Sequence, residues 1–444
     1  MSNTGSLRRT EARQLLGFTT RRVTMAIATL VLAVVMISFK PFQLNSGQVT
    51  EGGDIVNQLG FGSLGALCLF SLLSFVDRRV LAALFSPWWL ALLGFLVLSV
   101  FNATDPSAAM RAASFTVIGI LAMTTVLALP RDADAFSTAL AAAGFAVVLL
   151  SYAGLVIFPD IAKHTADSIE PEHAGFWRGV FQHKNIAGPV MACFSFGGLY
   201  LWRRGWKRAG ALLFITAFLF MANTGSKTTA GLVPVAIGLV VLPGMIGMRL
   251  LTPILFVVAF VATGLATVGI VFIAPLTDLA NRLAPDLTYT GRTDLWKFMG
   301  DMIMRQPWTG YGYESFWGTP FVTSTDKSFD QSWDITGIVH GHEGYLDLAI
   351  AMGLPALCVA IVAFLIAPLI DYMRAPLLKE NIYLADFFMM ILLFTLFNAF
   401  LESFFFRRAD PVWLFFVMAA FGLRLIARFP VRAAPVCHRP AASS

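Results

Sequence analysis

Charged residues are scarce in this sequence. Lys, Arg, Asp and Glu together make up 13% of its 444 residues, whereas a typical soluble domain carries about 25%. Hydrophobic residues make up 57% of the chain, and the mean hydropathy is +0.73. This composition excludes an ordinary soluble domain, and we expect no nucleic acid among the partners.

Cysteine is also rare and unpatterned. The four cysteines are Cys68, Cys193, Cys358 and Cys437, and no CxxC or similar pairing occurs. Neither a disulfide framework nor a cysteine-based zinc site is therefore expected. The chain also lacks internal repeats, low-complexity tracts and a recognisable soluble domain, and we predict no cofactor.

The N-terminal segment does not have the form of a cleavable signal. Five arginines precede an apolar run over about 23–39. That run is longer than the usual apolar part of a signal peptide, and no A-x-A cleavage site follows it. It predicts a first transmembrane helix that starts on the cytoplasmic side.

Long apolar runs recur along the chain. Runs of about 17–25 apolar residues can cross a bilayer as helices, which satisfy their own backbone hydrogen bonds. We predict an all-α polytopic membrane protein of about 12 transmembrane helices. The expected spans are 23–39, 55–76, 82–101, 108–129, 135–158, 184–202, 209–223, 229–248, 251–274, 345–369, 384–405 and 411–427.

The distribution of Lys and Arg orients these spans. Basic residues concentrate in the segments that would be cytoplasmic, as in Arg203-Arg204 and Arg249, so both termini are predicted to be cytoplasmic. The expected organisation is a cytoplasmic N-terminal segment (1–22), helices 1–9 (23–274), a large periplasmic catalytic loop (275–344), helices 10–12 (345–427) and a cytoplasmic tail (428–444).

Several cations break this bias and fall on the predicted outer side. They are Arg178, Lys184, Lys227, Arg282, Arg292, Lys297, Arg305, Arg407 and Arg408. Long outer loops translocate regardless of charge, so random scatter is one interpretation. The other is a site for an anionic ligand, because arginine presents a planar fork that suits phosphate oxygens.

The loop over 275–344 is the longest polar interruption in the chain. It contains Gly291-Arg292-Thr293-Asp294-Leu295-Trp296 and Gly310-Tyr311-Gly312-Tyr313-Glu314, and it ends in His340-Gly341-His342-Glu343-Gly344-Tyr345-Leu346 at the start of the next span. Packing gives no reason for so many Arg, His, Trp and Gly residues at one membrane surface. We interpret this loop as the chemical centre, and its turn signals predict short helices packed on the membrane face.

Two shorter outer segments carry related residues. The first ends in Trp177-Arg178-Gly179-Val180-Phe181-Gln182-His183-Lys184-Asn185, which an ordinary membrane interface would also explain. The second, Asn223–Thr229, includes Gly225-Ser226-Lys227-Thr228 and is similar to the end of a phosphate loop. No strand precedes it, so we expect no nucleotide site, but Lys227 and the hydroxyls suit a diphosphate or a sugar.

Ionisable residues also lie within or at the ends of spans, namely Arg111, Asp347 and Glu402. Such residues usually face the interior of a bundle, as structural ion pairs or as functional groups. Glu343 and Asp347 are four residues apart and share one helix face.

The order of these motifs resembles the O-antigen ligase and polymerase superfamily, whose shared region is often called the Wzy C-terminal domain. The resemblance covers about 175–405. The ligase subgroup has a His, then Asn, Ser or Gln, then nine residues and a Gly. Here His342 is followed by Glu343, nine residues and Gly353. The Arg178–Asn185 motif looks more like exopolysaccharide polymerases of the succinoglycan type.

The resemblance implies metal-independent glycosyl transfer at the periplasmic face of the bacterial inner membrane. The donor would be a glycan on undecaprenyl diphosphate. The acceptor would be another lipid-linked repeat unit for a polymerase, or the lipid A core for a ligase. Besides the lipid bilayer, a flippase and a chain-length regulator are candidate partners.

Such a reaction needs a base for the acceptor proton and cations for the departing diphosphate. His342 is the first candidate base, because imidazole titrates near neutral pH. Glu343 is the second, or it orients the imidazole. Arg178 and Arg292 are the leading diphosphate ligands, and Lys184, Lys227 and Arg407 support them. The remaining predicted substrate-binding residues are His183, Asn185, Trp296, Tyr313, His340 and Glu402. Trp177, Trp296, Tyr313 and Trp333 could stack on sugar faces, although such rings are also ordinary at a membrane interface.

Other interpretations remain open. His340 and His342 could chelate a metal, but no third ligand stands at a recognisable spacing. His342 could also be a structural residue at a helix start, hydrogen-bonded to a carbonyl oxygen. A twelve-span secondary transporter fits the number of spans, although transporters often show repeated halves. A non-catalytic partner in polysaccharide export would keep the fold while losing the base and the arginine pair.

Overall fold

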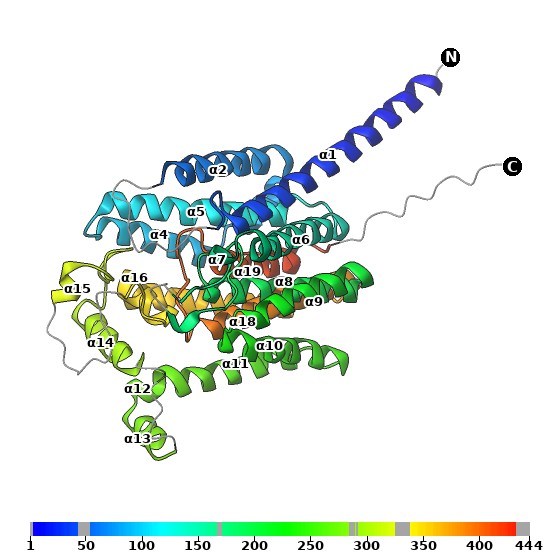
Figure 1. Cartoon of the computed structure of the whole chain (residues 1–444). Helices are drawn as coiled ribbons and strands as arrows, with labels where there is room; N and C mark the ends of the chain where they lie inside the picture. The colour runs from blue at the N-terminus through cyan, green and yellow to red at the C-terminus, as the bar shows by residue number, and fades with distance from the viewer. Residues whose placement is uncertain are drawn as a thin grey trace.

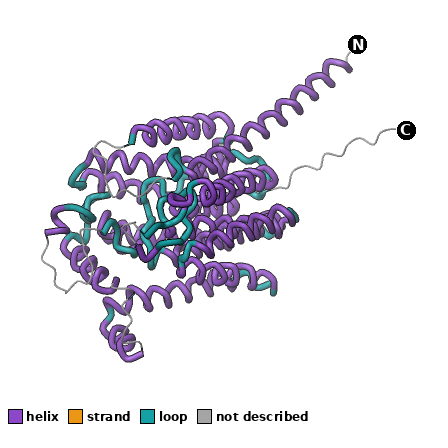
Figure 2. The backbone as a smooth tube through the Cα atoms, in the orientation of Figure 1, coloured by secondary structure: helices purple, strands orange, loops and turns teal. Residues whose placement is uncertain are grey.

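The computed structural model describes residues 3–42, 54–166, 171–283, 289, 292–324 and 338–431. These residues form helices and connecting loops and contain no β-strand; one isolated bridge joins Lys163 to Trp177 (Figures 1 and 2). The predicted all-α class is therefore confirmed. Gly291, Cys437 and most of the predicted cytoplasmic tail lie outside the described residues.

Nineteen α-helices and three short helical segments follow one another in the described residues. They are α1 (Asn3–Ile37), α2 (Ile55–Phe75), α3 (Arg78–Leu84), α4 (Pro87–Phe101), α5 (Pro106–Ala128), α6 (Ala133–Ile157), α7 (Pro159–Ala162), the 3₁₀ turn η1 (Pro171–His173), α8 (Lys184–Arg204), α9 (Lys207–Asn223), α10 (Lys227–Met245), α11 (Leu251–Gly264), the π-helical turn η2 (Leu265–Gly269), α12 (Ile270–Phe272), α13 (Ala274–Leu283), α14 (Arg292–Arg305), α15 (Pro320–Ser324), α16 (Gly344–Ile361), the π-helical turn η4 (Val362–Ile366), α17 (Ala367–Arg374), α18 (Lys379–Asn398) and α19 (Pro411–Arg428).

Helices occupy all twelve ranges in which spans were predicted. Nine of the described helices are long and apolar enough to cross a membrane, and a tenth follows if α3 and α4, bent by 62°, form one span. The predicted number of about twelve spans therefore exceeds the larger of these two counts, ten, by two. The other two ranges are α8, which carries charged residues at both ends, and α9, which has 17 residues.

Aspartate side chains start many of these helices. Asp54, Asp105, Asp132 and Asp410 each accept backbone N–H groups from the first turn of α2, α5, α6 and α19. An N-cap carboxylate satisfies backbone donors that otherwise have no partner and lies at the positive end of the helix dipole. These caps explain why each of these helices begins at a defined residue, although its apolar sequence has little pattern that would mark the start.

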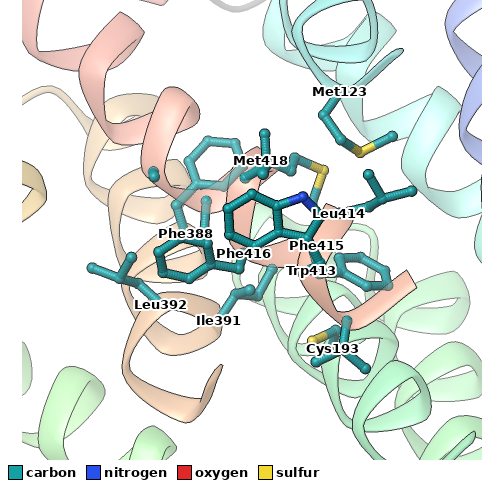
Figure 3. Close-up of a cluster of buried hydrophobic side chains, with 14 of the residues drawn as sticks. Met123, Cys193, Phe388, Ile391, Leu392, Trp413, Leu414, Phe415, Phe416 and Met418 are labelled. Atoms are coloured by element: carbon teal, nitrogen blue, oxygen red, sulfur yellow. The ribbon is translucent and has the colours of Figure 1, made fainter. Parts of the chain in front are cut away.

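The core lies along α18 and α19, which pack against each other and against α8. Of the membrane-length helices, α18 is the most enclosed, with 83% of its most apolar 18-residue stretch buried. Figure 3 shows Phe388, Ile391 and Leu392 of α18 beside Trp413 and Phe416 of α19. These aromatic and branched side chains fix the position of the connection between the two helices, which carries part of the candidate site.

Helix α16 is broken at Gly353, which has φ 84°, and Pro355 removes a further backbone donor. The predicted Gly310-Tyr311-Gly312 motif fills this break: the N–H groups of Tyr311 and Gly312 donate to the carbonyls of Ile350 and Ala351 at 2.7 and 3.2 Å. A Cβ on Gly310 would lie 2.4 Å from the Ile350 oxygen. This loop therefore docks against α16, and its glycines permit the close approach.

Ion pairs gather at the end of the bundle that was predicted to be cytoplasmic. Arg203 and Arg249 both pair with the buried Asp386, at 2.9 and 3.6 Å. Arg204 pairs with Asp134 and Glu380 at 2.7 and 2.6 Å. Helix α8 runs from its N-cap His183 at one end to this network at the other, so the motifs that were predicted for the outer side lie at the opposite end of the bundle.

Candidate active site

A mostly buried carboxylate, Glu402, lies where three of the predicted segments meet. Its Oε1 accepts a hydrogen bond from Asn185 Nδ2 at 3.1 Å and lies 3.6 Å from the guanidinium of Arg292. Its Oε2 lies 3.4 Å from Nδ1 of His342. The α18–α19 connection thus brings together the start of α8, the start of α14 and the loop before α16.

The surroundings of Glu402 favour its charged form. Burial by itself would raise the pKa of the carboxyl group. The nearby His342, together with the charges of Arg292 and His183, outweighs burial and holds the pKa of Glu402 below its ordinary value. Glu402 is therefore an internal anion that holds cationic and hydrogen-bond-donating side chains around it.

Arg292 is the first residue of α14 and stands at the edge of this cluster. Its NH1 donates to the Leu401 carbonyl at 2.7 Å, and its side chain remains 24% exposed. Contacts to a carbonyl and a carboxylate fix the direction of the guanidinium while leaving donors for another anion. The structure thus places the predicted Arg292 beside the predicted His342 and Glu402.

His342 has a backbone φ of 52°, in the left-handed region that few residues other than glycine adopt. Neighbouring contacts hold this strained conformation. Trp296 Nε1 donates to the Gly341 carbonyl at 3.1 Å, and the Gly341 N–H donates to Asp347 at 2.8 Å. A Cβ on Gly341 would lie 2.3 Å from the end of the Met299 side chain, so a larger residue there would require Met299 to move. Strain of this kind is common at functional sites.

The His342 ring is 34% exposed, and its Nδ1 is buried. Nδ1 is at ion-pair distance from Glu402 but is not aligned for a hydrogen bond in this structure. Catalytic hydrogen bonds are often loose before substrate binds. A small rotation of the ring would let Glu402 accept the Nδ1 proton and leave Nε2 unprotonated.

His340 has a different environment although its ring centre is only 4.2 Å from that of His342. Burial, reinforced by the positive charges of His342, Arg407 and Arg292, holds the pKa of His340 well below its usual value. Its Nδ1 accepts the His342 N–H at 3.4 Å. His340 is therefore a neutral imidazole with its proton on Nε2, which makes it a hydrogen-bond donor rather than a base.

Glu343, the second candidate base, is a buried helix cap. Its Oε2 accepts the N–H of Leu346 in the first turn of α16, and its own N–H donates to Ser403 Oγ at 3.0 Å. Its Oε1 has no hydrogen-bond partner among the described residues. Burial, followed by the nearby Asp347, raises the pKa of Glu343 well above its ordinary value. The carboxylate that could orient His342 is Glu402, and Glu343 fits the role of an uncharged cap.

Glu343→Gln is expected to retain activity and to remove a pH dependence of stability. A glutamate in the unfolded chain loses its proton near pH 4.5, whereas folded Glu343 keeps its proton to higher pH. Wild-type stability should therefore fall as pH rises above that value. The Tm of the variant should exceed that of the wild type at about pH 8, and the difference should vanish in acid. Loss of transfer activity in a folded Glu343→Gln variant would restore Glu343 as a catalytic acid or base.

Arg178, predicted to bind diphosphate together with Arg292, lies in a packed loop. Its guanidinium donates to the carbonyls of Ile161 and Gln182, and only 5% of the residue is exposed. Burial lowers its pKa. A loop folded against a helical bundle needs donors for its buried carbonyls, and Arg178 provides them. Of the two arginines, only Arg292 borders the Glu402 cluster.

The other basic residues differ in their accessibility. His183 caps α8, and Lys184 is buried with its ammonium 4.4 Å from the ring centre of Phe176. Lys227 is exposed at the start of α10. Its turn lies against the first part of α8, because a Cβ on Gly188 would be 3.1 Å from Ser226. Arg407 is half-buried, and its NH1 is 3.5 Å from the Ser403 carbonyl.

Of the four aromatic residues predicted to stack on sugars, Trp296 and Tyr313 are buried, Trp177 is partly buried, and Trp333 lies outside the described residues. Trp296 is wholly buried among the side chains of α14 and α16, and Tyr313 is 4% exposed with its hydroxyl bonded to the Phe406 carbonyl. Neither ring presents a face to a ligand in this structure. Both instead support backbone segments of the site.

Two groups of side chains in the described part of the chain resemble metal ligand sets: His164, His173 and His183, and His340, His342 and Glu402. Metal-bound imidazoles usually donate their other N–H group. At the start of α8, however, backbone N–H groups donate to His164 and His183 at 3.2 and 3.1 Å. In the second group, the positive charges of Arg292 and Arg407 already act on His340. These surroundings do not favour a cation, and metal independence stays a prediction.

Sequence reasoning missed the residues that hold the His342 loop. Asp347 was recognised only as an ionisable residue near a span start; it accepts hydrogen bonds from Gly341 and, at 2.7 Å, from Trp317. Trp317 and Ser403 carried no signal of their own. An acid in the first turn of an apolar helix was the one available indication.

The fold and this cluster define an integral membrane protein of the all-α class, with ionisable side chains collected at one end of its helical bundle. Residues 210–361 match a family described as O-antigen ligase. The chain is also 25% identical over 321 residues to the Exopolysaccharide production protein ExoQ of Rhizobium meliloti (strain 1021), across 66% of this chain and 68% of that protein. These findings confirm the resemblance to the polysaccharide ligase and polymerase superfamily. The matched family region includes Arg292 and His342 but ends before Glu402.

Proposed function

We propose that this protein is a membrane glycosyltransferase. It polymerises oligosaccharide repeat units carried on undecaprenyl diphosphate into exopolysaccharide or O-antigen at the periplasmic face of the inner membrane. The observation that supports this proposal most directly is the arrangement of Arg292 and His342 around Glu402. Arg292 would be the cation for a departing diphosphate and His342 the base for an attacking hydroxyl, and both side chains lie next to the Glu402 carboxylate.

The proposed reaction forms one glycosidic bond and breaks one sugar–phosphate bond. The acceptor hydroxyl oxygen attacks the anomeric carbon of the donor, and the diphosphate leaves with the bonding electron pair. Arg292, held by Leu401 and Glu402, stabilises the negative charge that develops on the leaving group. Arg407 and the exposed Lys227 are further candidate diphosphate ligands.

His342 takes the acceptor proton on Nε2 in this mechanism. Glu402 holds the ring through Nδ1 and stabilises the imidazolium that forms, much as a buried aspartate does in a serine protease. Asn185 fixes the other oxygen of Glu402. Neutral His340 is placed to donate a hydrogen bond from Nε2 to a substrate oxygen.

The distribution of charge supports the proposed orientation. Ion-paired arginines such as Arg203 and Arg249 lie at the opposite end of the bundle from His342. Positive charge is concentrated on the cytoplasmic side of inner-membrane proteins, which directs the candidate site to the periplasm. A lipid-linked donor would reach it from the outer leaflet.

A second candidate function is transfer of a finished glycan to the lipid A core, because the matched family is described as O-antigen ligase. The similarity to a protein named for exopolysaccharide production favours the polymerase. Glu343 stands where the ligase subgroup has Asn, Ser or Gln. An uncharged Glu343 cap resembles those residues chemically, so this position does not exclude a ligase.

Incubation of the purified protein with a lipid-linked repeat unit tests these candidates. A ladder of longer lipid-linked glycans is expected with the repeat unit alone. A product that appears only after lipid A core is added would identify a ligase. Parallel reactions with a chelator test metal independence, and absence of transfer in every mixture would reject the glycosyltransferase proposal.

A further inference from the structure

An apolar groove lies between α8 and α9, near the end of the bundle that was predicted to be cytoplasmic. The two helices are side by side (Figure 1), and the groove between them has a volume of about 280 Å³. Its lining consists of Leu199, Trp202, Ala211, Phe214 and Ile215. Small-molecule sites usually enclose roughly 300–1,000 Å³, so this groove suits part of one acyl chain.

Two glycines bring the helices together and so shape the groove. A Cβ on Gly198 of α8 would lie 2.4 Å from the backbone nitrogen of Phe214, and a Cβ on Gly210 of α9 would lie 2.4 Å from that of Trp202. The two backbones are therefore in contact, because no side chain separates them at these positions. The rings of Trp202 and Phe214 flank this contact and form the walls of the groove.

The groove opens towards the lipid. Trp202 and Ile215 of its lining are 45% and 53% exposed, and α8 and α9 occupy two of the predicted spans. Exposed apolar side chains on such helices contact acyl chains. A tryptophan at the end of a span is typical of the membrane–water interface, and Trp202 is the third residue from the end of α8. The groove therefore extends from the acyl chains to the level of the headgroups.

Two cations stand at the headgroup end of the groove. Lys207 and Arg208 start α9, are exposed, and form no ion pair with a carboxylate in the part of the chain that the structure describes. Lys207 Nζ lies 3.8 Å from the centre of the Trp202 ring, one wall of the groove. Ala211 and Ile215 follow the two cations at helical spacings of three or four residues, so all four share one face of α9.

We propose that this groove is a binding site for an anionic phospholipid of the membrane. One acyl chain lies along the rings of Trp202 and Phe214, and the phosphate group meets Lys207 and Arg208. Charge decides between the occupants. A zwitterionic phospholipid carries its own positive group and gains less from two cations, and an apolar helix of another protein would leave both cations without an anion. The inference is independent of the proposed glycosyl transfer.

Native mass spectrometry of the whole chain in detergent tests this assignment, because it counts bound lipid molecules directly. Dioleoyl phosphatidylglycerol is the anionic probe and dioleoyl phosphatidylcholine is the zwitterionic probe, each titrated separately. Wild type is expected to bind one phosphatidylglycerol at least about fivefold more tightly than phosphatidylcholine, since a single cation near an anionic headgroup contributes about that factor. Equal dissociation constants for the two lipids would overturn the site.

Removing the two cations should remove the preference. The double substitution Lys207→Gln with Arg208→Gln is expected to lower the affinity for phosphatidylglycerol to that for phosphatidylcholine and to leave the latter unchanged. The matched control is Arg78→Gln with Arg79→Gln, an exposed pair at the start of α3 that is not part of the groove. The control should keep the wild-type preference. Equal losses in the two double variants would indicate general attraction of anionic lipid and would overturn a site at this groove.

Filling the groove tests its apolar part at unchanged charge. Ala211→Trp is expected to weaken phosphatidylglycerol binding by at least about fivefold, the value of one or two buried methylenes. Leu212→Trp adds the same ring at a neighbouring position that is 56% exposed and outside the lining, so it should bind as wild type does. Equal binding by the two variants would overturn the groove as the acyl site. A mass of two copies without lipid, lost in Ala211→Trp, would assign the groove to a second copy of the chain and reject the lipid.

Discussion

His342→Ala is expected to lower the turnover number by about 10²–10⁴-fold, the usual contribution of a positioned general base. The donor should still bind, because Arg292 keeps its contacts to Leu401 and Glu402 without the imidazole. Single-turnover transfer from a lipid-linked repeat unit measures the rate, and binding of the labelled donor measures the affinity.

Glu402→Gln provides the comparison for this prediction. It keeps the size of the side chain but removes the negative charge that faces His342, so it should lower turnover while leaving the imidazole in place. A wild-type rate in folded His342→Ala would remove His342 from the mechanism. If His342→Ala lost donor binding and turnover together, His342 would be a substrate ligand rather than the base.

Arg292→Ala is expected to abolish polymer formation while the protein still inserts and folds. Loss of a group that stabilises developing charge typically costs about 10²–10³-fold in rate. The deletion also leaves Glu402 with one cation fewer, so folding must be checked by Tm. Arg292→Lys should restore little activity, because an ammonium cannot contact Leu401, Glu402 and a phosphate with a planar fork.

Arg305→Ala is the matched control for Arg292→Ala. Arg305 is the last residue of the same helix, α14, and is exposed. Arg305→Ala removes the same charge as Arg292→Ala, but at the other end of that helix. The substitution should therefore leave polymer yield and length unchanged. Equal effects of the two substitutions would indicate a general electrostatic contribution and would reject a specific diphosphate contact at Arg292.

Much of this protein was predictable from local sequence. Apolar runs that must form helices in a bilayer determined the all-α class. The candidate segments were also recognisable, because Arg292, His342 and Glu402 are costly or unusual residues at a membrane boundary. Their types and spacings were sufficient to predict a polar site at the outer end.

Only the tertiary structure decided which of these residues meet. Arg178 and Arg292 looked equivalent in the sequence, yet one satisfies loop carbonyls and the other borders Glu402. Glu343 follows His342 in the chain, but the carboxylate beside the imidazole comes from the α18–α19 connection, 60 residues further on. Sequence patterns report local periodicity and the energetic cost of placing an ionisable residue at a membrane. The burial of a side chain and its hydrogen-bond partners depend instead on which distant backbone groups need hydrogen bonds. That requirement is set only when the helices pack.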